Sequence, residues 1–147
     1  MNRIVVNNIF IKDSMNIERA GNMGRTLLKI SVIYFMFGIS IGLYTSVTHA
    51  FNLTTLHVHV NLLGWMSLAL VGVFYHLYPS LEKTILAKFH FWLHNIGLPV
   101  MMVCIAMAIQ GVGEYFFPLA TLGGIITLLG ICCFGFNVLF NMRKEVS

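Results

Sequence analysis

Long apolar stretches separated by short polar segments dominate this chain. Four of them lie at about residues 27–48, 56–78, 89–109 and 116–140. Each is long enough for an α-helix to cross ~30 Å of hydrocarbon, which takes ~20 residues. None alternates apolar and polar positions, and each contains glycine, so the pattern favours helices over strands. We therefore predict an all-α membrane protein, a four-helix transmembrane bundle whose short loops make neighbouring helices antiparallel.

The composition supports this prediction. Of 147 residues, 58% are hydrophobic and 10% are charged, and the mean hydropathy is +0.84. A soluble domain cannot easily hide so much apolar surface. We expect one compact transmembrane domain over residues 27–141, preceded by an N-terminal segment (1–26) and followed by a short tail (142–147). The N-terminal segment lacks the apolar core and cleavage site of a secretory signal, so we expect it to remain.

The positive charges indicate the orientation in the membrane. All nine Lys and Arg lie before or at the start of the first helix, between the second and third helices, or after the fourth. With four spans these regions share one side, which the positive-inside rule places in the cytoplasm. We expect a multi-pass protein of a bacterial inner membrane with both termini cytoplasmic. This topology explains the net charge of +4 without a nucleic-acid partner.

Two histidines lie one residue apart near the outer end of the second predicted helix, and a third precedes them in the loop. On an α-helix, His57 and His59 point ~200° apart, so they cannot bind one small ion together. They are suited to two different partners on opposite sides of the helix. Ionisable groups inside spans are functional candidates, and haem commonly takes a neutral imidazole ligand in apolar surroundings. The alternative is that each imidazole only hydrogen-bonds a neighbouring helix.

The other three histidines are expected at the inner end. His76 follows His57 by nineteen residues, or ~28 Å of α-helix at ~1.5 Å per residue. His90 and His94 begin the third helix, and their spacing of four places them on one helix face. If His76 lies opposite, the three imidazoles form a transition-metal site. The rival hypothesis is therefore a metal-binding or transport protein that uses His76, His90 and His94.

Two segments resemble the catalytic subunit of haem-copper oxidases, the superfamily of cytochrome c oxidase subunit I and nitric oxide reductase. HVHVNLLGWMSLALVGVFYHLYPSL (57–81) is similar to its tenth transmembrane helix, which has an H-x-H pair near the outer end and a His-aromatic-aromatic-Pro ending. Here that ending has Leu77 in the middle. AKFHFWLHNIGLPVMM (87–102) resembles the start of the next helix, which often reads Lys-x-His-Phe. The likeness covers residues ~45 to ~102.

The resemblance implies a haem protein. His57 matches the proximal ligand of the high-spin haem and His59 the ligand of the low-spin haem. His49 matches a region near the haem propionates, and Asn61 is placed to orient a ligand or to bond across helices. The family subunit has twelve spans in three four-helix arcs, so this chain corresponds to about one third of it, its helices nine to twelve. We extrapolate to a homotrimer in which His57 of one protomer and His59 of the next hold one haem b, about one per protomer.

Departures from the family limit the expected chemistry. The family's copper centre needs histidines that the outer half of the third span lacks, and no His-His pair occurs in the chain. No copper centre is therefore expected, and whether the chain is an enzyme stays open. A haem with two histidine ligands would have no open position for oxygen, which leaves electron transfer or haem carriage, with the redox partner unidentified. Binding of a gas such as nitric oxide is a further alternative. Without a CxxCH motif no c-type linkage is expected. A non-catalytic assembly or regulatory subunit is a further alternative.

Two further patterns concern the packing of the first helix and the cysteines. Gly38 and Gly42 form a small-xxx-small pair, which is typical of close helix packing in membranes. Cys104, Cys132 and Cys133 lie inside apolar spans without a CxxC spacing. We expect them to be buried and unreactive thiols.

Overall fold

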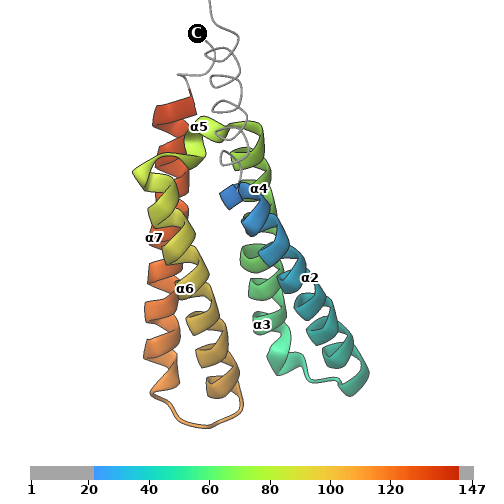
Figure 1. Cartoon of the computed structure of the whole chain (residues 1–147). Coiled ribbons are helices and arrows are strands. Elements are labelled where there is room, and N and C mark those ends of the chain that lie inside the picture. The colour runs from blue at the N-terminus through green and yellow to red at the C-terminus, as the bar shows by residue number, and fades with distance from the viewer. Residues whose placement is uncertain (1–21, 143–147) are drawn as a thin grey trace, which may run out of the picture.

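The structure, a computed structural model, describes residues 22–142 and contains four long helical segments (Figure 1). Residues 1–21 of the predicted N-terminal segment (1–26) and residues 143–147 of the tail lie outside the described residues. The rest of that segment, 22–26, belongs to α2. In chain order the elements are α2 (Asn22–Thr48), η1 (Phe51–Leu53), α3 (Thr54–His59), η2 (Val60–Ser67), α4 (Leu68–Leu77), α5 (Pro79–Glu82), α6 (Ile85–Ile109) and α7 (Phe116–Asn141). Elements η1 to α4 follow one another in a single span, Phe51–Leu77.

All four spans are long and apolar enough to cross a membrane, which confirms the predicted number and order. Within residues 22–142 the chain forms no strand. Three spans begin earlier than predicted: α2 at Asn22, the second span at Phe51 and α6 at Ile85. Hydropathy locates the apolar part of a span, whereas the residue at which a helix begins is defined by capping. At α6 the side chain of Thr84 accepts a hydrogen bond from the Ala87 N–H at 3.1 Å.

The four spans are arranged as two antiparallel hairpins rather than as one evenly packed bundle. Figure 1 shows α2 beside α3 and α4, and α6 beside α7; the two pairs meet near α5 and diverge toward the other end. We call these ends the α5 end and the loop end. A groove of about 590 Å³ lies between the hairpins, lined by residues of α2, α3, η2 and α6. The four helices thus form two hairpins, which pack together through Val60, Leu98 and Met102 and leave a groove on one side.

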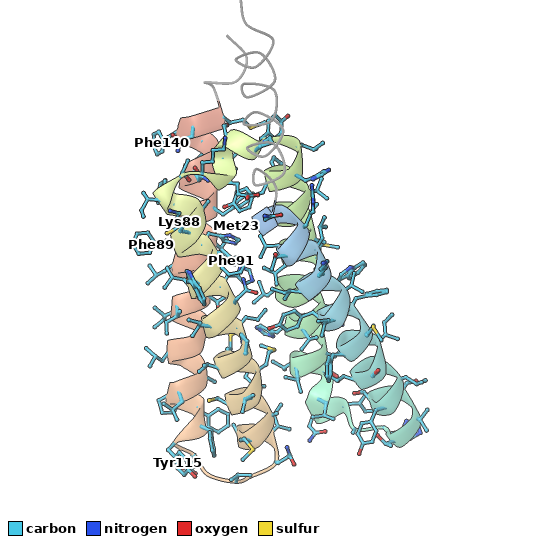
Figure 2. The ribbon with its side chains drawn as sticks, in the orientation of Figure 1. Met23, Lys88, Phe89, Phe91, Tyr115 and Phe140 are labelled. Atoms are coloured by element: carbon cyan, nitrogen blue, oxygen red, sulfur yellow. The ribbon has the colours of Figure 1, made fainter. Side chains whose placement is uncertain are left out.

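The outer surface of both hairpins is apolar. Figure 2 shows Phe89 and Phe140 projecting outward near the α5 end and Tyr115 at the loop end. These three side chains are 53%, 69% and 61% exposed. Amphipathic aromatic rings such as that of Tyr115 favour the border between membrane and water. The exposed aromatic residues agree with a lipid-facing surface, as expected for a membrane protein.

Backbone contact at glycines joins α6 to α7. A Cβ atom added at Gly123 would lie 2.6 Å from the Met101 backbone nitrogen, and one at Gly97 would lie 2.7 Å from that of Thr127. At Gly130 it would lie 2.9 Å from the His94 nitrogen. Small residues let transmembrane helices approach this closely because they carry little or no side chain. The α6–α7 hairpin therefore depends on glycine at these positions.

The second span is not a regular α-helix. Its middle, Val60–Ser67, is an eight-residue π-helix, in which each turn holds more residues than in an α-helix. The Ser67 hydroxyl also donates to the carbonyl oxygen of Leu62, five residues earlier, at 2.8 Å. Our prediction of a continuous α-helix from 56 to 78 is wrong here, because residues 60–67 contain no proline and a single glycine, Gly64, to mark an irregularity. The distance from His57 to His76 therefore cannot be calculated from the rise per residue of an α-helix.

Two polar contacts tie the α5 turn to the long helices. Asn137, fully buried on α7, donates to the Leu81 carbonyl at 3.0 Å and accepts from the Thr84 hydroxyl at 2.9 Å. The carboxylate of Glu82, which is 8% exposed, accepts from the N–H groups of Met23 at 3.1 Å and Gly24 at 3.2 Å. Glu82 thus satisfies two free donors in the first turn of α2 and complements the helix dipole there.

Replacing Glu82 with alanine should lower the free energy of unfolding by about 1.5–3 kcal/mol, the usual worth of hydrogen bonds to a charged group. Two N–H groups lose their acceptor at a site that water reaches poorly. Thermal unfolding of the detergent-solubilised protein measures the loss. The matched control is Glu114→Ala, in the exposed loop between α6 and α7. Equal stability of the two variants would contradict a capping role for Glu82.

Candidate functional site

His57 lies in α3 at the loop end and contacts α2. Its Nδ1 is 2.8 Å from the carbonyl oxygen of Gly38. Because a carbonyl oxygen can only accept, Nδ1 carries the proton and donates it to this bond. In a neutral imidazole the other nitrogen, Nε2, then has its lone pair free for a ligand. Within residues 22–142, nothing hydrogen-bonds to His57 Nε2.

Asn61 and the two glycines of α2 hold His57 in place. A Cβ at Gly42 would lie 2.6 Å from His57 Cε1, and a Cβ at Gly38 would lie 2.5 Å from the Asn61 amide. The Asn61 Nδ2 group donates to the His57 carbonyl oxygen at 2.8 Å, and it also lies 3.3 Å from Nδ1. The close packing predicted from the Gly38–Gly42 pair is thus confirmed. The two glycines leave room for the side chains of His57 and Asn61.

His59 is oriented by its own helix. Its Nδ1 lies 2.8 Å from the carbonyl oxygen of Thr55, four residues earlier. By the same reasoning Nδ1 donates, and the Nε2 lone pair stays free. Both histidines lie in the regular α-helical part of the span, Thr54–His59. At ~100° per residue, two positions apart on such a helix point to nearly opposite sides. Both rings are partly exposed, so a ligand on either Nε2 would lie at the surface of this chain.

His49 ends α2 in an unusual backbone conformation. It is exposed, and its φ of 55° lies in the left-handed region, which glycine or asparagine adopts at lower cost. Its carbonyl accepts the Phe51 N–H at 2.9 Å, and the two rings lie 5.9 Å apart. Strain of this kind clusters at functional positions. Among the described residues no hydrogen bond joins His49 to His57 or His59, so His49 is near them in sequence without being bonded to them.

The groove between the hairpins is not lined by the outer histidines. Leu56 and Val60 of the second span face it, together with residues of α2 and α6 such as Tyr34 and Pro99. His57 and His59 are absent from its lining. A ligand bound at their Nε2 atoms would therefore lie outside this groove, on the faces that the single chain presents to its surroundings.

No family model, curated protein or solved structure matches this chain. The function of the site is consequently argued from its own geometry.

The inner histidines separate into a buried pair and an exposed third. His90 and His94 are fully buried, with ring centroids 5.3 Å apart. His94 Nε2 lies 3.0 Å from the carbonyl oxygen of Leu63 in the π-helix and donates to it. His76 is exposed. In the described part of the chain, no three His, Cys, Asp or Glu side chains gather in a metal-binding group. The structure therefore brings together only two of the three residues of the predicted inner metal site.

The cysteines differ from one another. Cys104 is buried as expected, but Cys132 is exposed and Cys133 is intermediate. Our expectation of three buried thiols is wrong for Cys132, because the apolar pattern of α7 extends around the helix and cannot tell the packed side from the lipid-facing side. No two of the three are paired.

The sequence did not reveal what orients the candidate ligands. The acceptors that fix the two outer imidazoles are backbone carbonyls of Gly38 and Thr55, and a carbonyl carries no residue-specific signal. Only the Gly38–Gly42 pair hinted at the close approach. Chemically, the arrangement offers two imidazoles, each oriented through its Nδ1 hydrogen bond, whose Nε2 atoms bond to no other described group. Histidine ligands of metals and haem are commonly oriented through their second nitrogen in this way.

Proposed function

We propose that this chain is a membrane haem protein that binds haem b through His57 and His59 near one face of the membrane. The observation that carries the proposal is the pair of bonds from Nδ1 to the carbonyls of Gly38 and Thr55. They hold each imidazole in the tautomer that a metal ligand requires, with a free lone pair on Nε2. Ionisable side chains are energetically costly inside a membrane span, and those that occur there usually have a function.

The partly exposed rings support a homotrimer. If one haem joins His57 of one protomer and His59 of the next, it lies at the contact between protomers and both rings become covered. In a closed threefold ring each contact joins two different faces, so there are as many contacts as protomers and about one haem per chain. The opposite directions of the two side chains on α3 suit such a head-to-tail arrangement. The likeness of residues ~45–102 to one part of a threefold oxidase subunit points the same way.

A haem held by His57 and His59 would supply one-electron transfer. In this role His57 and His59 bind, Asn61 and Gly42 position His57, and exposed His49 is available to a propionate at the loop end. We place the protein in a bacterial inner membrane with the α5 end cytoplasmic, because Lys83 and Lys88 lie at that end. A haem that serves assembly or regulation would use the same ligands, whereas gas sensing would require the gas to displace one of the two histidines.

The test is an absorbance spectrum of the purified protein, oxidised and then reduced with dithionite, with haem and chain quantified. Sharp low-spin bands, about one haem per chain and a trimeric mass would support the proposal. A colourless protein, expressed with haem available, would end it. A five-coordinate, high-spin ferrous haem would instead exclude ligation by both histidines.

Replacing Gly42 with alanine should lower the affinity for haem about 10- to 100-fold, as loss of the groups that orient a ligand typically does. The new Cβ would lie 2.6 Å from His57 Cε1, so the ring must move away from the Gly38 carbonyl. Titration of the haem-free protein with haemin measures the change. The control is Gly135→Ala, where nothing lies within 4 Å of the added atom. Unchanged affinity in Gly42→Ala would show that the position of His57 does not matter for binding.

A further inference from the structure

The groove between the two hairpins has the size and the lining of a binding site for a small molecule. Its volume, about 590 Å³, lies within the ~300–1,000 Å³ that such sites usually have. Twelve side chains from α2, the second span and α6 line it, and ten of them are apolar. The two polar ones are Tyr34 of α2 and Asn95 of α6. Mostly apolar walls with a few polar groups are typical of ligand sites.

Both polar side chains have an oxygen that is free to bond a ligand. Among the described residues, nothing hydrogen-bonds to the Tyr34 hydroxyl or to Asn95 Oδ1. Neither oxygen belongs to the fully buried polar atoms that lack a partner, so both are accessible. The side chains are also held in place. Asn95 Nδ2 donates to the Phe91 carbonyl at 2.7 Å, and the Tyr34 ring packs on Gly64, where an added Cβ would lie 2.5 Å from Cγ. A site oriented in advance loses little freedom on binding.

A proline adds a further acceptor at the same place. Pro99 lies inside α6 and has no N–H, so the Asn95 backbone carbonyl four residues earlier lacks its usual helical donor. Asn95 and Pro99 both line the groove, since residues four apart share one face of a helix. The groove therefore offers acceptors at Asn95 and, at Tyr34, a hydroxyl that can both donate and accept.

These polar groups lie at mid-depth in the spans rather than at the membrane surface. Both α2 and α6 begin at the α5 end, and Tyr34 lies twelve residues into α2 and Asn95 ten residues into α6. At ~1.5 Å per residue this is ~15–18 Å of helix. The apolar part of the groove continues toward the loop end as far as Ile41 and Ala106. A phospholipid keeps its polar head at the surface, so only its acyl chain would reach this depth and the polar groups would stay unbonded, which is unfavourable.

We propose that the groove binds a membrane-soluble quinone, with its ring beside Tyr34 and Asn95 and its apolar tail along the groove toward the loop end. The carbonyl oxygens of a quinone accept from the Tyr34 hydroxyl, and the hydroxyls of the reduced quinol donate to Asn95. Its uncharged ring can enter the hydrocarbon, unlike the head of a phospholipid. Neither His57 nor His59 lines the groove, so this binding does not depend on the proposed haem.

The test is a titration of the purified full-length protein in detergent with decylubiquinone, with the partition of this probe into empty micelles subtracted. We expect saturable binding near one quinone per chain. Tyr34→Phe removes only the hydroxyl and should weaken binding roughly tenfold, the usual effect of losing one hydrogen bond. Asn95→Leu should weaken it at least as much. The matched control is Tyr44→Phe, at an exposed position of the same helix outside the groove, which should bind like the original protein.

Binding that does not saturate above the micelle background would overturn the proposal. Equal affinity of Tyr34→Phe and Tyr44→Phe would do so as well, because an acyl chain or any other apolar molecule needs no hydroxyl. A phospholipid that copurifies and that decylubiquinone does not displace would assign the groove to lipid instead. A colourless protein that binds decylubiquinone with the expected losses would end the haem proposal and support this one.

Discussion

His57→Ala and His59→Ala are each expected to abolish the low-spin haem spectrum of the purified protein. Each variant removes one of the two axial ligands that we propose, and alanine offers no lone pair in its place. In the proposed homotrimer every contact between protomers uses one His57 and one His59. Either substitution therefore removes a haem ligand from all of the contacts. Haem content per chain and the reduced-minus-oxidised spectrum measure the loss. The control is His76→Ala, an exposed histidine at the α5 end, which should leave the spectrum unchanged.

Mixed trimers separate ligation between protomers from ligation within one. When His57→Ala and His59→Ala chains are co-expressed in equal amounts, about one quarter of the contacts join an intact His57 to an intact His59 of the neighbour. About one quarter of the haem should therefore return. No return would contradict the shared site. Normal spectra in both single variants would contradict ligation by these histidines altogether.

Replacing Gly123 with alanine is expected to destabilise the α6–α7 hairpin by about 1–3 kcal/mol, the usual cost of overpacking a well-filled core. The added Cβ would lie 2.6 Å from the Met101 backbone nitrogen and 2.9 Å from the Gly97 carbonyl oxygen. Backbone atoms cannot rotate away as a side chain can, so the two helices must separate. The change is measured as the unfolding temperature in detergent or by titration with denaturant.

Gly135→Ala is the matched control because it lies on the same helix with nothing within 4 Å of the added Cβ. Alanine favours the helix over glycine by up to ~1 kcal/mol, so this variant should be as stable as the original or slightly more so. A similar loss at both positions would mean that helix propensity rather than close packing governs α7. Gly123→Leu should be worse than Gly123→Ala, because the leucine side chain needs more room between the helices.

The outer and the inner histidines differ in which hairpins they contact. The outer histidines are oriented within one hairpin, by Gly38 of α2 and by Thr55 of α3 itself. The inner pair contacts both hairpins through the bond to Leu63. A change that separates the hairpins should therefore break the bond from His94 to Leu63 before it disturbs the orientation of His57 and His59.

The sequence by itself determined the helices and the local geometry of the H-x-H pair. Hydropathy is a property of each segment, so four spans could be counted from it, although the exact start of three spans and the π-helix in the second were missed. The opposite directions of His57 and His59 follow from the α-helical period, which holds because both lie in α3. The Gly38–Gly42 spacing correctly indicated close packing, because helices approach each other closely only where their residues are small.

Only the tertiary structure decided which histidines meet and which nitrogens are free. His90 and His94 are neighbours on one helix, but whether His76 joins them depends on how the second span packs, and the π-helix between Val60 and Ser67 carries no sequence signal. The tautomers of His57, His59 and His94 depend on carbonyls of Gly38, Thr55 and Leu63. Every residue has such a carbonyl, so the choice of partner comes from the fold and cannot be read from residue identity.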